Sequence, residues 1–560
     1  MPAPPGAPAP TGAGAPPAGG APTPAEGPPP PPSEGPPSPP SEGPPPPPSE
    51  GPPPPPSEGP PPPPSEGRAA LERRAALAVA VLVARTVAQQ IAILGGNVWL
   101  ARLLDPADFG LFAIVQFALN VFAAVGDVGL GAALVQRKAV ATHRELSSIF
   151  WTQILLALGV VAAVAAAAPA LPRVWPKLTP GSEWLLRALA FQLLLTAARA
   201  VPSLMLEREL RFGRLAVIDF AMTVAFYATA VPLAARGLGT FALVYAVLAQ
   251  GLVANALMAV FRPFRPALAL DVALVRPFVR FGLLFQTKNL LSMVNEWVIP
   301  VVAGGMLGPA AVGLHNWARQ TAYFPLTFTG IVCRVAFPLL SRLRDDPDAF
   351  ARTLGRAVHL CGIVTLFFSG LFVGLGAPLT RVVFGEKWLP ALPVLTLYAL
   401  VHTVGFLSPV FAAAFDGLGR PGVTVRLMAG WTTFNWLAAP LAVLLERTPF
   451  GFAVGACLHT VLGNPLTVYV YRRVGPPGNP VARLWSCFAA GALSAALGRA
   501  LLAPNVRGPA SLVAAVAAHL VVYFAALLAI DPRARAEVRA LARTRQLFGA
   551  EPDAARAAPH

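Results

Sequence analysis

The chain has 560 residues, of which 55% are hydrophobic and 12% are charged. Soluble globular proteins carry about 25% charged residues, so this composition, with a mean hydropathy of +0.58, indicates a protein that lies in a lipid bilayer. The net charge of +16 does not indicate a nucleic-acid partner, because the basic residues lie in short loops between apolar runs and form no continuous basic face.

The first 67 residues are rich in Pro, Gly, Ala, Ser and Glu, and from Ser33 they follow an eight-residue repeat of Ser-Glu-Gly and a run mostly of proline. Polyproline II segments joined by flexible Ser-Glu-Gly units cannot bury a core. We therefore predict a disordered cytoplasmic tail with no role in transport; docking of a partner on its PxxP stretches is the alternative. No cleavable signal peptide is recognisable, so the first membrane helix is expected to act as the signal anchor.

From Leu77 onward the chain is a succession of apolar stretches, each long enough to cross roughly 30 Å of hydrocarbon. They predict an all-α polytopic membrane protein of about fourteen transmembrane helices. The predicted spans are residues 77–103, 109–134, 148–171, 184–206, 214–235, 238–261, 281–307, 310–338, 357–380, 388–415, 424–445, 451–471, 484–503 and 509–530.

The loops between these spans alternate in their content of basic residues. If the amino terminus is inside, one set of loops holds clusters such as Arg137, Lys138 and Arg144, whereas the opposite loops at 105–108 and 308–309 hold none. This asymmetry is the positive-inside rule. It predicts a multi-pass protein of the cytoplasmic (inner) membrane with both termini in the cytoplasm.

An internal repeat divides the membrane region. LARLLDPADFGLF (100–112) is similar to GGMLGPAAVGLHN (304–316) at an offset of roughly 203 residues. The offset pairs Pro106 with Pro309, and Gly110 with Gly313. It predicts two pseudo-symmetric six-helix bundles with two further helices at the carboxyl end, and substrate sites in such folds lie between the halves.

The predicted organisation therefore has five parts. They are a disordered tail at 1–67, a first six-helix bundle at 68–270, a second six-helix bundle at 271–475, two additional transmembrane helices at 476–530, and a basic cytoplasmic tail at 531–560.

Polar residues inside the spans point to a candidate site, because an ionisable group in hydrocarbon costs at least about 2.5 kcal/mol and usually faces a cavity or a partner. The repeat offset pairs Arg85 with Lys288, and Gln116 with Arg319. Helical spacing places further polar residues on the same helix faces. The predicted substrate cavity comprises Arg85, Gln89, Gln116, Asn120, Lys288, Ser292, Asn295 and Arg319.

A cationic cavity between two helical bundles suits an anionic head group, since arginine and lysine bind pyrophosphate while polar neighbours contact sugar hydroxyls. The alternative is that each cation snorkels or pairs with an acid, for example Lys288 with Glu296 or Asp219. Glu296, ahead of Asp219, is also a candidate for proton or cation coupling, because a buried carboxylate has a raised pKa unless a cation offsets its desolvation.

The cysteines and histidines do not indicate a metal or redox site. Cys333, Cys361, Cys457 and Cys487 lie far apart inside apolar stretches, which favours simple burial. The seven histidines are scattered, without the spacing of a metal-binding motif. We predict no metal and no cofactor.

Three sequence blocks in the first three spans resemble a known family. They are LARLLDPADFGLFAI (100–114), GDVGLGAALVQRK (126–138) and SIFWTQ (148–153). They resemble the polysaccharide-transport branch of the multidrug/oligosaccharidyl-lipid/polysaccharide exporter superfamily, the Wzx-type flippases. The resemblance implies a V-shaped pair of six-helix bundles, alternating access and a lipid-linked saccharide as cargo. It also implies that cations of the first, seventh and eighth helices line the central cavity, which by position falls on Arg85, Lys288 and Arg319.

These features predict a flippase that translocates undecaprenyl-pyrophosphate-linked oligosaccharide units for the biosynthesis of O-antigen, capsule or exopolysaccharide. Alternatives are a lipid II flippase or a cation-coupled drug antiporter of the same superfamily, although a drug antiporter should have a carboxylate-dominated cavity. An enzyme is disfavoured, because the longest predicted extracytoplasmic loop, 172–183, has only about a dozen residues. The expected partners are the lipid-linked oligosaccharide, membrane lipid and a polymerase or export machinery.

Overall fold

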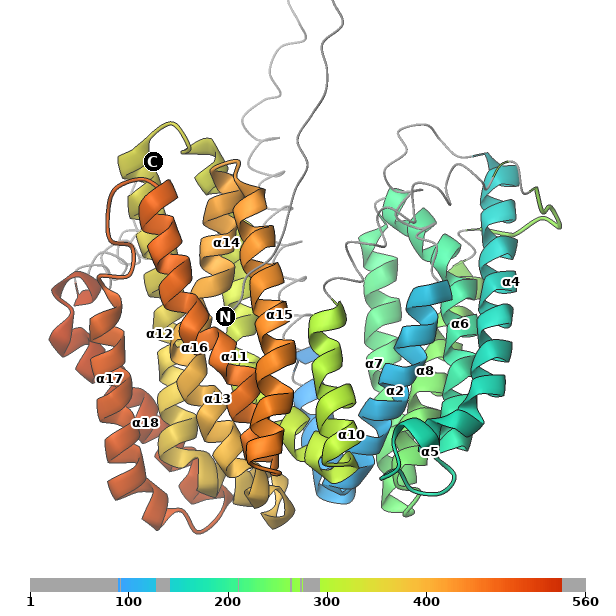
Figure 1. Cartoon of the computed structure of the whole chain (residues 1–560), viewed down its shortest axis with the longest axis horizontal. Coiled ribbons are helices and arrows are strands. Elements are labelled where there is room, and N and C mark those ends of the chain that lie inside the picture. The colour runs from blue at the N-terminus through green and yellow to red at the C-terminus, as the bar shows by residue number, and fades with distance from the viewer. Residues whose placement is uncertain are drawn as a thin grey trace, which may run out of the picture. The chain divides into compact units, whose positions relative to one another are not determined.

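The computed structural model describes residues 89–126 apart from 91, 142–271 apart from 210, 262 and 263, residue 274, and 293–535. Every regular element in these ranges is helical (Figure 1). Within them, twelve helical segments are long and apolar enough to cross a membrane. The prediction of an all-α polytopic membrane protein is confirmed.

The first half of the described chain contains five long helices. They are α2 (Pro106–Gly126), α4 (His143–Ala167), α6 (Ser182–Arg208), α7 (Phe212–Ala235) and α8 (Thr240–Phe261), with the short η1 (Ala168–Ala170) and α5 (Leu171–Val174) after α4. Residues 89, 90 and 92–103 are helical and belong to the first predicted span, whose residues 77–88 and 91 lie outside the described residues.

The second half begins at residues 293–298, which are helical and belong to the seventh predicted span. The elements that follow are η2 (Ile299–Ala303), α10 (Gly304–Met306), α11 (Pro309–Arg342), α12 (Pro347–Leu379), η3 (Thr380–Phe384), η4 (Glu386–Ala391), α13 (Leu392–Gly405), α14 (Leu407–Gly417), α15 (Pro421–Leu445) and α16 (Pro449–Val474). The chain continues with α17 (Leu484–Leu497), η5 (Gly498–Leu502), η6 (Ala503–Asn505) and α18 (Pro509–Ile530).

All twelve of these helical segments coincide with predicted spans. The first, second and seventh predicted spans are described only in part, so the total of fourteen stays a prediction. One boundary differs clearly: α12 begins at Pro347 rather than at 357. Asp346 caps this helix by accepting a hydrogen bond from the backbone N–H of Ala349 (2.9 Å), so the helix starts in polar sequence before the apolar stretch on which the prediction depended.

Caps formed by polar side chains fix the starts of other helices too. At α4, the N–H of Glu145 donates to Thr142 Oγ1 (3.2 Å), and the N–H of Thr142 donates to Glu145 Oε2 (2.8 Å). At α16, the N–H of Gly451 donates to Thr448 Oγ1 (3.0 Å). Each cap satisfies backbone donors that have no partner within the helix, which matters most where a helix is about to enter lipid.

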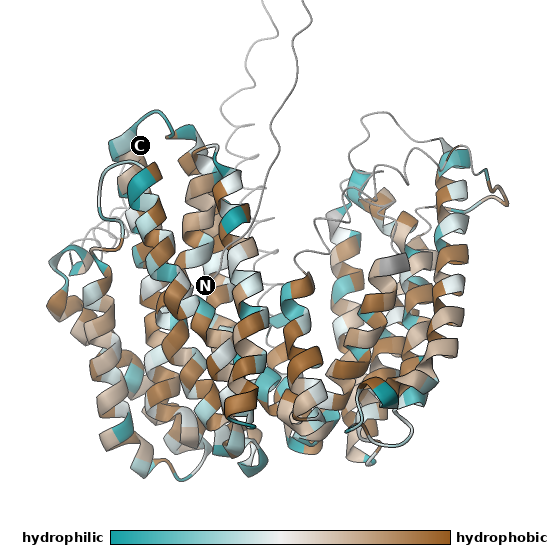
Figure 2. Ribbon diagram, in the orientation of Figure 1, coloured by the Kyte–Doolittle hydropathy of each residue, from teal (hydrophilic) through white to brown (hydrophobic). Residues whose placement is uncertain are grey.

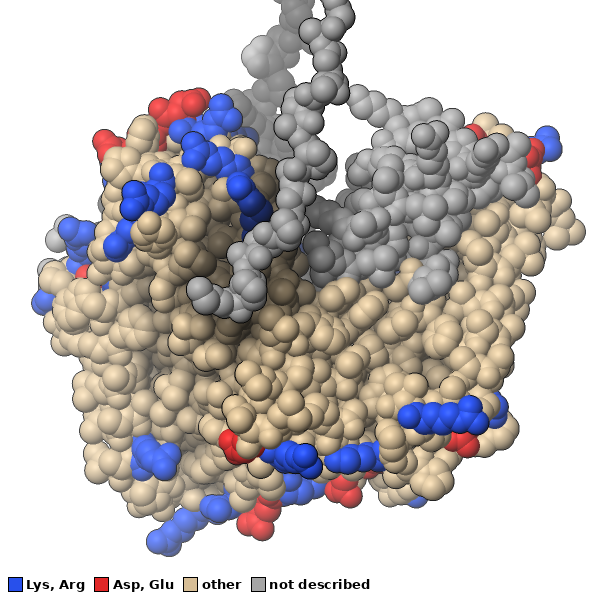
Figure 3. Space-filling view, in the orientation of Figure 1, with Lys and Arg blue, Asp and Glu red and all other residues tan. Residues whose placement is uncertain are grey.

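The surface has the pattern expected of a membrane protein. Hydrophobic residues cover most of the length of the helices, and hydrophilic residues gather near their ends (Figure 2). On the face drawn in Figure 3, the lysine, arginine and acidic residues lie along the lower edge and on the upper part, with an uncharged band between them. Large apolar side chains such as Leu445, Val513 and Leu437 are strongly exposed, which lipid explains.

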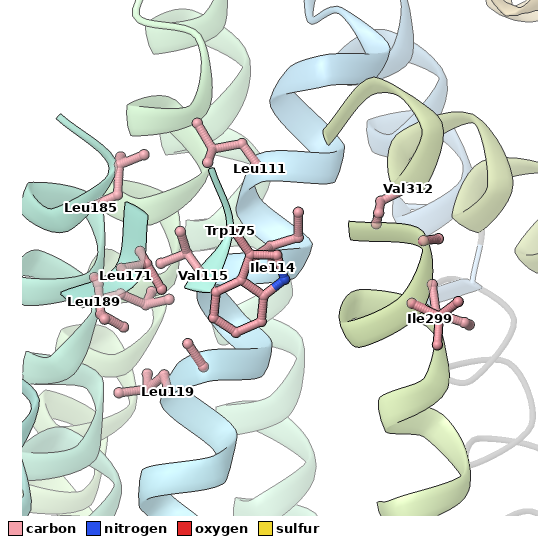
Figure 4. Close-up of a cluster of buried hydrophobic side chains, with 14 of the residues drawn as sticks. Leu111, Ile114, Val115, Leu119, Leu171, Trp175, Leu185, Leu189, Ile299 and Val312 are labelled. Atoms are coloured by element: carbon pink, nitrogen blue, oxygen red, sulfur yellow. The ribbon is translucent and has the colours of Figure 1, made fainter. Parts of the chain in front are cut away.

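The two halves share a buried cluster. Trp175, which follows α5, is 8% exposed and packs with Ile114 and Val115 of α2 and with Ile299 and Val312 of the second half (Figure 4). Its ring nitrogen donates to the carbonyl oxygen of Pro300 at 2.9 Å. Packing and a buried hydrogen bond therefore join the first half to the start of the second.

The two copies of the internal repeat contact each other reciprocally. A Cβ atom added at Gly110 of α2 would overlap the carbonyl oxygen of Pro309, and one added at Gly313 of α11 would overlap that of Pro106. Only glycine allows two helix backbones to approach this closely. The residues that the sequence offset pairs are therefore the residues at which α2 and α11 cross.

Candidate functional site

An ion pair lies at the start of the second half. Arg319, on α11, donates from Nη2 to Oε2 of Glu296, on the described end of the seventh span, at 3.1 Å. The side chain of Arg319 is 29% exposed and that of Glu296 is 58% exposed. The sequence allowed pairing of a cavity cation with an acid, and the structure shows this pairing for Arg319.

Both residues line a cavity of about 530 Å³. Its wall is formed by Asn295, Glu296, Val298 and Ile299 and by residues of α11, α13, α14, α15 and α16. Of the residues that the sequence assigned to the substrate cavity, Asn295 and Arg319 are in this wall, and so is the coupling candidate Glu296. The structure therefore brings three predicted site residues together.

Hydrogen bonds fasten the seventh span to α15 beside this cavity. Asn435 Nδ2 donates to Asn295 Oδ1 at 3.2 Å, and Trp436 Nε1 donates to the carbonyl oxygen of Val294 at 2.9 Å. These bonds fix the orientation of the turn that carries Glu296, because polar groups inside a helical bundle hold neighbouring helices in one arrangement. Asn295 is therefore both a wall residue and a positioning residue.

The other described residues of the predicted cavity lie elsewhere. Gln116 and Asn120, on α2, bond to each other (Nε2 to Oδ1, 3.0 Å), and Gln89 donates to Thr223 Oγ1 on α7 at 3.2 Å. Asp219 is also on α7, and none of these four is in the wall of the 530 Å³ cavity. Arg85, Lys288 and Ser292 lie outside the described residues, so the proposed pairing of the two cationic helices stays a prediction.

Several wall residues were missed by the sequence reading. They are Tyr323 on α11, His402 on α13, Trp431 and Asn435 on α15, and His459 and Thr460 on α16. The available signal was the presence of histidine and asparagine inside apolar spans, where polar groups are rare and usually face a cavity. Treating the histidines only as possible metal ligands concealed it.

A second feature lies where the segment 101–105 meets η3 and η4, and we term it the clasp. Arg102 donates to the carbonyl oxygens of Val382 and Val383, the latter at 2.8 Å. In return, Lys387 donates to the carbonyl oxygen of Arg102 (3.0 Å) and lies 3.4 Å from Asp105.

An indole completes the clasp. Trp388 Nε1 donates to the carbonyl oxygen of Ala101 at 2.8 Å, and its ring is fully buried. The ring of Trp317 stacks on that of Trp388 with centroids 5.2 Å apart, and Phe109 meets it edge-on at 5.6 Å. Polar and aromatic contacts thus tie the end of the first span to the second half, next to the loop at 105–108.

Comparison with known proteins places the chain in a family. The family model described as polysaccharide biosynthesis protein matches residues 99–393, which is more than half of the 560 residues. The chain belongs to this polysaccharide biosynthesis family. The match covers the clasp, the reciprocal crossing of α2 and α11, and the ion pair of Arg319 with Glu296.

Named relatives are similar over about half of the chain. The lipopolysaccharide biosynthesis protein WzxC of Escherichia coli (strain K12) is 25% identical over 304 residues, which are 53% of this chain and 61% of the relative. The succinoglycan biosynthesis transport protein ExoT of Rhizobium meliloti (strain 1021) is 26% identical over 309 residues, covering 54% and 60%. The teichuronic acid biosynthesis protein TuaB of Bacillus subtilis (strain 168) is 25% identical over 331 residues, covering 55% and 68%.

Two solved structures share the fold. A lipid II flippase MurJ in an inward closed conformation superposes with a TM-score of 0.66 at 12% identity, over 82% of this chain and 99% of that one. An inward-facing transporter of the multidrug resistance MATE family superposes with a TM-score of 0.53 at 16% identity, over 69% and 94%. At these identities the two structures show a shared fold, and the predicted resemblance to a polysaccharide biosynthesis family is confirmed by the family model.

Proposed function

We propose that this protein is a flippase that carries undecaprenyl-pyrophosphate-linked oligosaccharide units across the cytoplasmic membrane for the synthesis of O-antigen, capsule or exopolysaccharide. The observation that carries the proposal is the position of Arg319 and Glu296 in a 530 Å³ cavity among apolar spans, in a chain of the polysaccharide biosynthesis family. A charged pair inside a membrane bundle is costly, so its retention favours a role in handling a polar cargo.

In this proposal Arg319, together with Arg85 and Lys288, binds the pyrophosphate. The polar residues Gln89, Gln116, Asn120, Ser292 and Asn295 contact the saccharide. Arg319 is already paired with Glu296, so an anionic head group competes with that carboxylate for the same guanidinium. Protonation of Glu296, or binding of a cation to it, releases Arg319 for the cargo and couples transport to an ion; Asp219 is the second candidate for this coupling.

The clasp supports alternating access as the mechanism. The clasp holds the segment 101–105 to η3 and η4 next to the loop that the positive-inside rule places outside the cytoplasm. Closure there would separate the cavity from the extracytoplasmic side, and opening would require the bonds of Arg102, Lys387 and Trp388 to break. The clasp is thus the proposed extracytoplasmic gate.

The proposed organisation keeps the parts predicted from the sequence. The two bundles are 68–270 and 271–475, the additional helices are 476–530, and the tails 1–67 and 531–560 are cytoplasmic. A polymerase or export machinery would use the lipid-linked unit after its transfer.

Complementation tests this function. Flippase-null strains whose surface glycans have known structures are transformed with the chain, and the returning polymer is identified by its sugar composition. Return of a polymer in at least one strain, with its loss in Arg319→Ala, is the expected result. A chain that inserts normally, restores no polymer and instead rescues a strain depleted of its lipid II flippase would overturn the proposal in favour of lipid II transport.

A further inference from the structure

The cavity wall contributed by α13, α15 and α16 has the chemistry of a carbohydrate pocket. We infer that it binds an uncharged sugar ring of the cargo, apart from the cations that bind the pyrophosphate. The inference rests on the proposed function, because the sugar is taken to belong to the lipid-linked unit. The residues that carry it are Trp431, Asn435 and His402.

The size of the cavity is suitable. At about 530 Å³ it lies within the range of roughly 300–1,000 Å³ that is usual for small-molecule sites. All of its described wall residues belong to the second half of the chain. The pocket therefore does not depend on how far the two halves open during transport.

An aromatic wall lies on one side. Trp431 of α15 faces Gly463 of α16, where an added Cβ atom would lie 3.0 Å from the indole ring. A side chain at position 463 would thus press on the ring. Tyr323, 48% exposed, adds a second aromatic group to the wall. Flat aromatic faces present a large apolar surface at low entropic cost, and they suit the C–H face of a sugar ring.

Polar atoms without partners line the same space. Both ring nitrogens of His402 and Oδ1 of Asn435 are buried and have no hydrogen-bond partner among the described residues. Asn435 is only 6% exposed, and its amide nitrogen is already used by Asn295. A buried polar atom without a partner destabilises the protein, so a ligand that supplies hydrogen bonds is favoured there.

Hydroxyl groups meet these requirements. Each can donate one hydrogen bond and accept others, whereas a neutral imidazole offers one donor and one acceptor and the Asn435 oxygen only accepts. A ligand with several hydroxyls on one ring can therefore satisfy His402 and Asn435 together. A simple cation could not, because it provides no acceptor for an imidazole N–H.

The charge of the wall favours an uncharged ring. Among the described wall residues, Glu296 and Arg319 are the ionised ones, and they neutralise each other at 3.1 Å. An acidic sugar would find no further cation among these residues. Since Arg319 shares the cavity with Trp431 and Asn435, a sugar seated on the indole lies in the same space as the cation that binds pyrophosphate.

Direct binding to the full chain in lipid nanodiscs tests the inference. The probes are glucose, galactose, N-acetylglucosamine and N-acetylgalactosamine, with glucuronate as a charged comparison, and the readout is saturation-transfer NMR with competition between sugars. At least one uncharged sugar should bind. Asn435→Ala and His402→Ala should each weaken it by about tenfold, the effect of losing one ordinary hydrogen bond.

Matched variants locate the site. Gly463→Ala should weaken binding because its methyl group displaces Trp431, whereas Gly430→Ala, on the same helix as Trp431 with nothing within 4 Å of its added Cβ, should leave binding unchanged. Trp431→Phe should retain binding and Trp431→Ala should lose it. The inference is overturned if no uncharged sugar binds to the wild type. It is also overturned if Gly463→Ala and Trp431→Ala bind the sugar as tightly as the wild type does.

Export separates this inference from the proposed function. If the pocket variants export polymer normally while Arg319→Ala does not, the assignment of the sugar pocket is wrong and the proposed flippase function is supported. If the wild type binds sugar through Trp431 but restores no polymer in any null strain, the sugar pocket is supported and the proposed flippase function is wrong.

Discussion

The guanidinium of Arg319 and the carboxylate of Glu296 line the same cavity and form an ion pair with an N–O distance of 3.1 Å. In the proposed function, an anionic cargo competes with Glu296 for Arg319, and a proton or cation competes with Arg319 for Glu296. The 58% exposure of Glu296 leaves the pair open to a competing ligand in the cavity.

The first prediction concerns this pair. Arg319→Ala should abolish or cripple export at normal membrane abundance, whereas Arg319→Lys should retain part of it, because a positive charge remains. Surface polymer and protein abundance are measured in the same cells. Low abundance in Arg319→Ala that is restored by adding Glu296→Ala would instead indicate a purely structural pair, and normal export would contradict the assignment of Arg319 to the cargo.

The second prediction concerns the clasp. Removing the bonds of Trp388 or Arg102 should favour opening at that end, so a cysteine at Thr460 in the cavity wall should react several-fold faster with a membrane-impermeant reagent added outside the cell. The background has Cys333, Cys361, Cys457 and Cys487 replaced by serine. Arg381→Ala is the matched control, since Arg381 pairs with Glu386 within the second half. Equal labelling in all variants would show that the clasp does not gate the cavity.

The third prediction concerns the crossing of α2 and α11. Gly313→Ala should lower the stability of the protein by about 1–3 kcal/mol, the usual effect of overpacking, because its methyl group would overlap the Pro106 carbonyl. Gly330→Ala, on the same helix with nothing within 4 Å, should be neutral or slightly stabilising. Thermal unfolding of the purified variants in detergent compares them, and an unchanged Gly313→Ala would disprove the close approach.

The fourth prediction concerns Asp531, which follows α18. Burial opposes its charge, but the N–H groups of Ala534 and Arg533 and the nearby Arg483 and His359 outweigh this effect and hold its pKa below the ordinary value of 3.8. A lowered pKa contributes stability that is fully present above the unfolded value and is lost as the pH falls through the folded value.

Asp531→Asn should therefore lower the unfolding temperature at neutral pH. Its difference from the wild type should shrink as the pH falls below about 4, where the carboxylate of the unfolded chain becomes protonated. A difference that stays constant over this range would show that the charge of Asp531 does not stabilise the fold.

The fifth prediction is topological. In the cysteine-free background, a cysteine at Asp105 should react with an impermeant reagent from outside the cytoplasm, and one at Asp345 only from inside. Both side chains are well exposed, at 75% and 95%, so access should not limit the reaction. Labelling of Asp105→Cys from the cytoplasm would reverse the predicted orientation.

The sequence by itself determined the spans of this protein. A bilayer requires about twenty apolar residues in a helix, and this requirement is local, so α18 was predicted at 509–530 with both ends correct. The repeat could also be recognised in the sequence, because proline and glycine recur at the two helix starts that cross. The pairs Pro106–Pro309 and Gly110–Gly313 were identified in this way.

The tertiary structure decided where the cavity lies. In a soluble helix the polar face is exposed, but lipid is as apolar as a protein core, so a membrane helix gives little sign of which face meets its neighbours. The sequence offset placed Gln116 and Arg319 in one cavity; Arg319 lies in the wall of the 530 Å³ cavity, and a shared cavity with Gln116 stays a prediction. His402, Trp431 and His459 come from three helices and meet only when these helices pack, which no local pattern encodes.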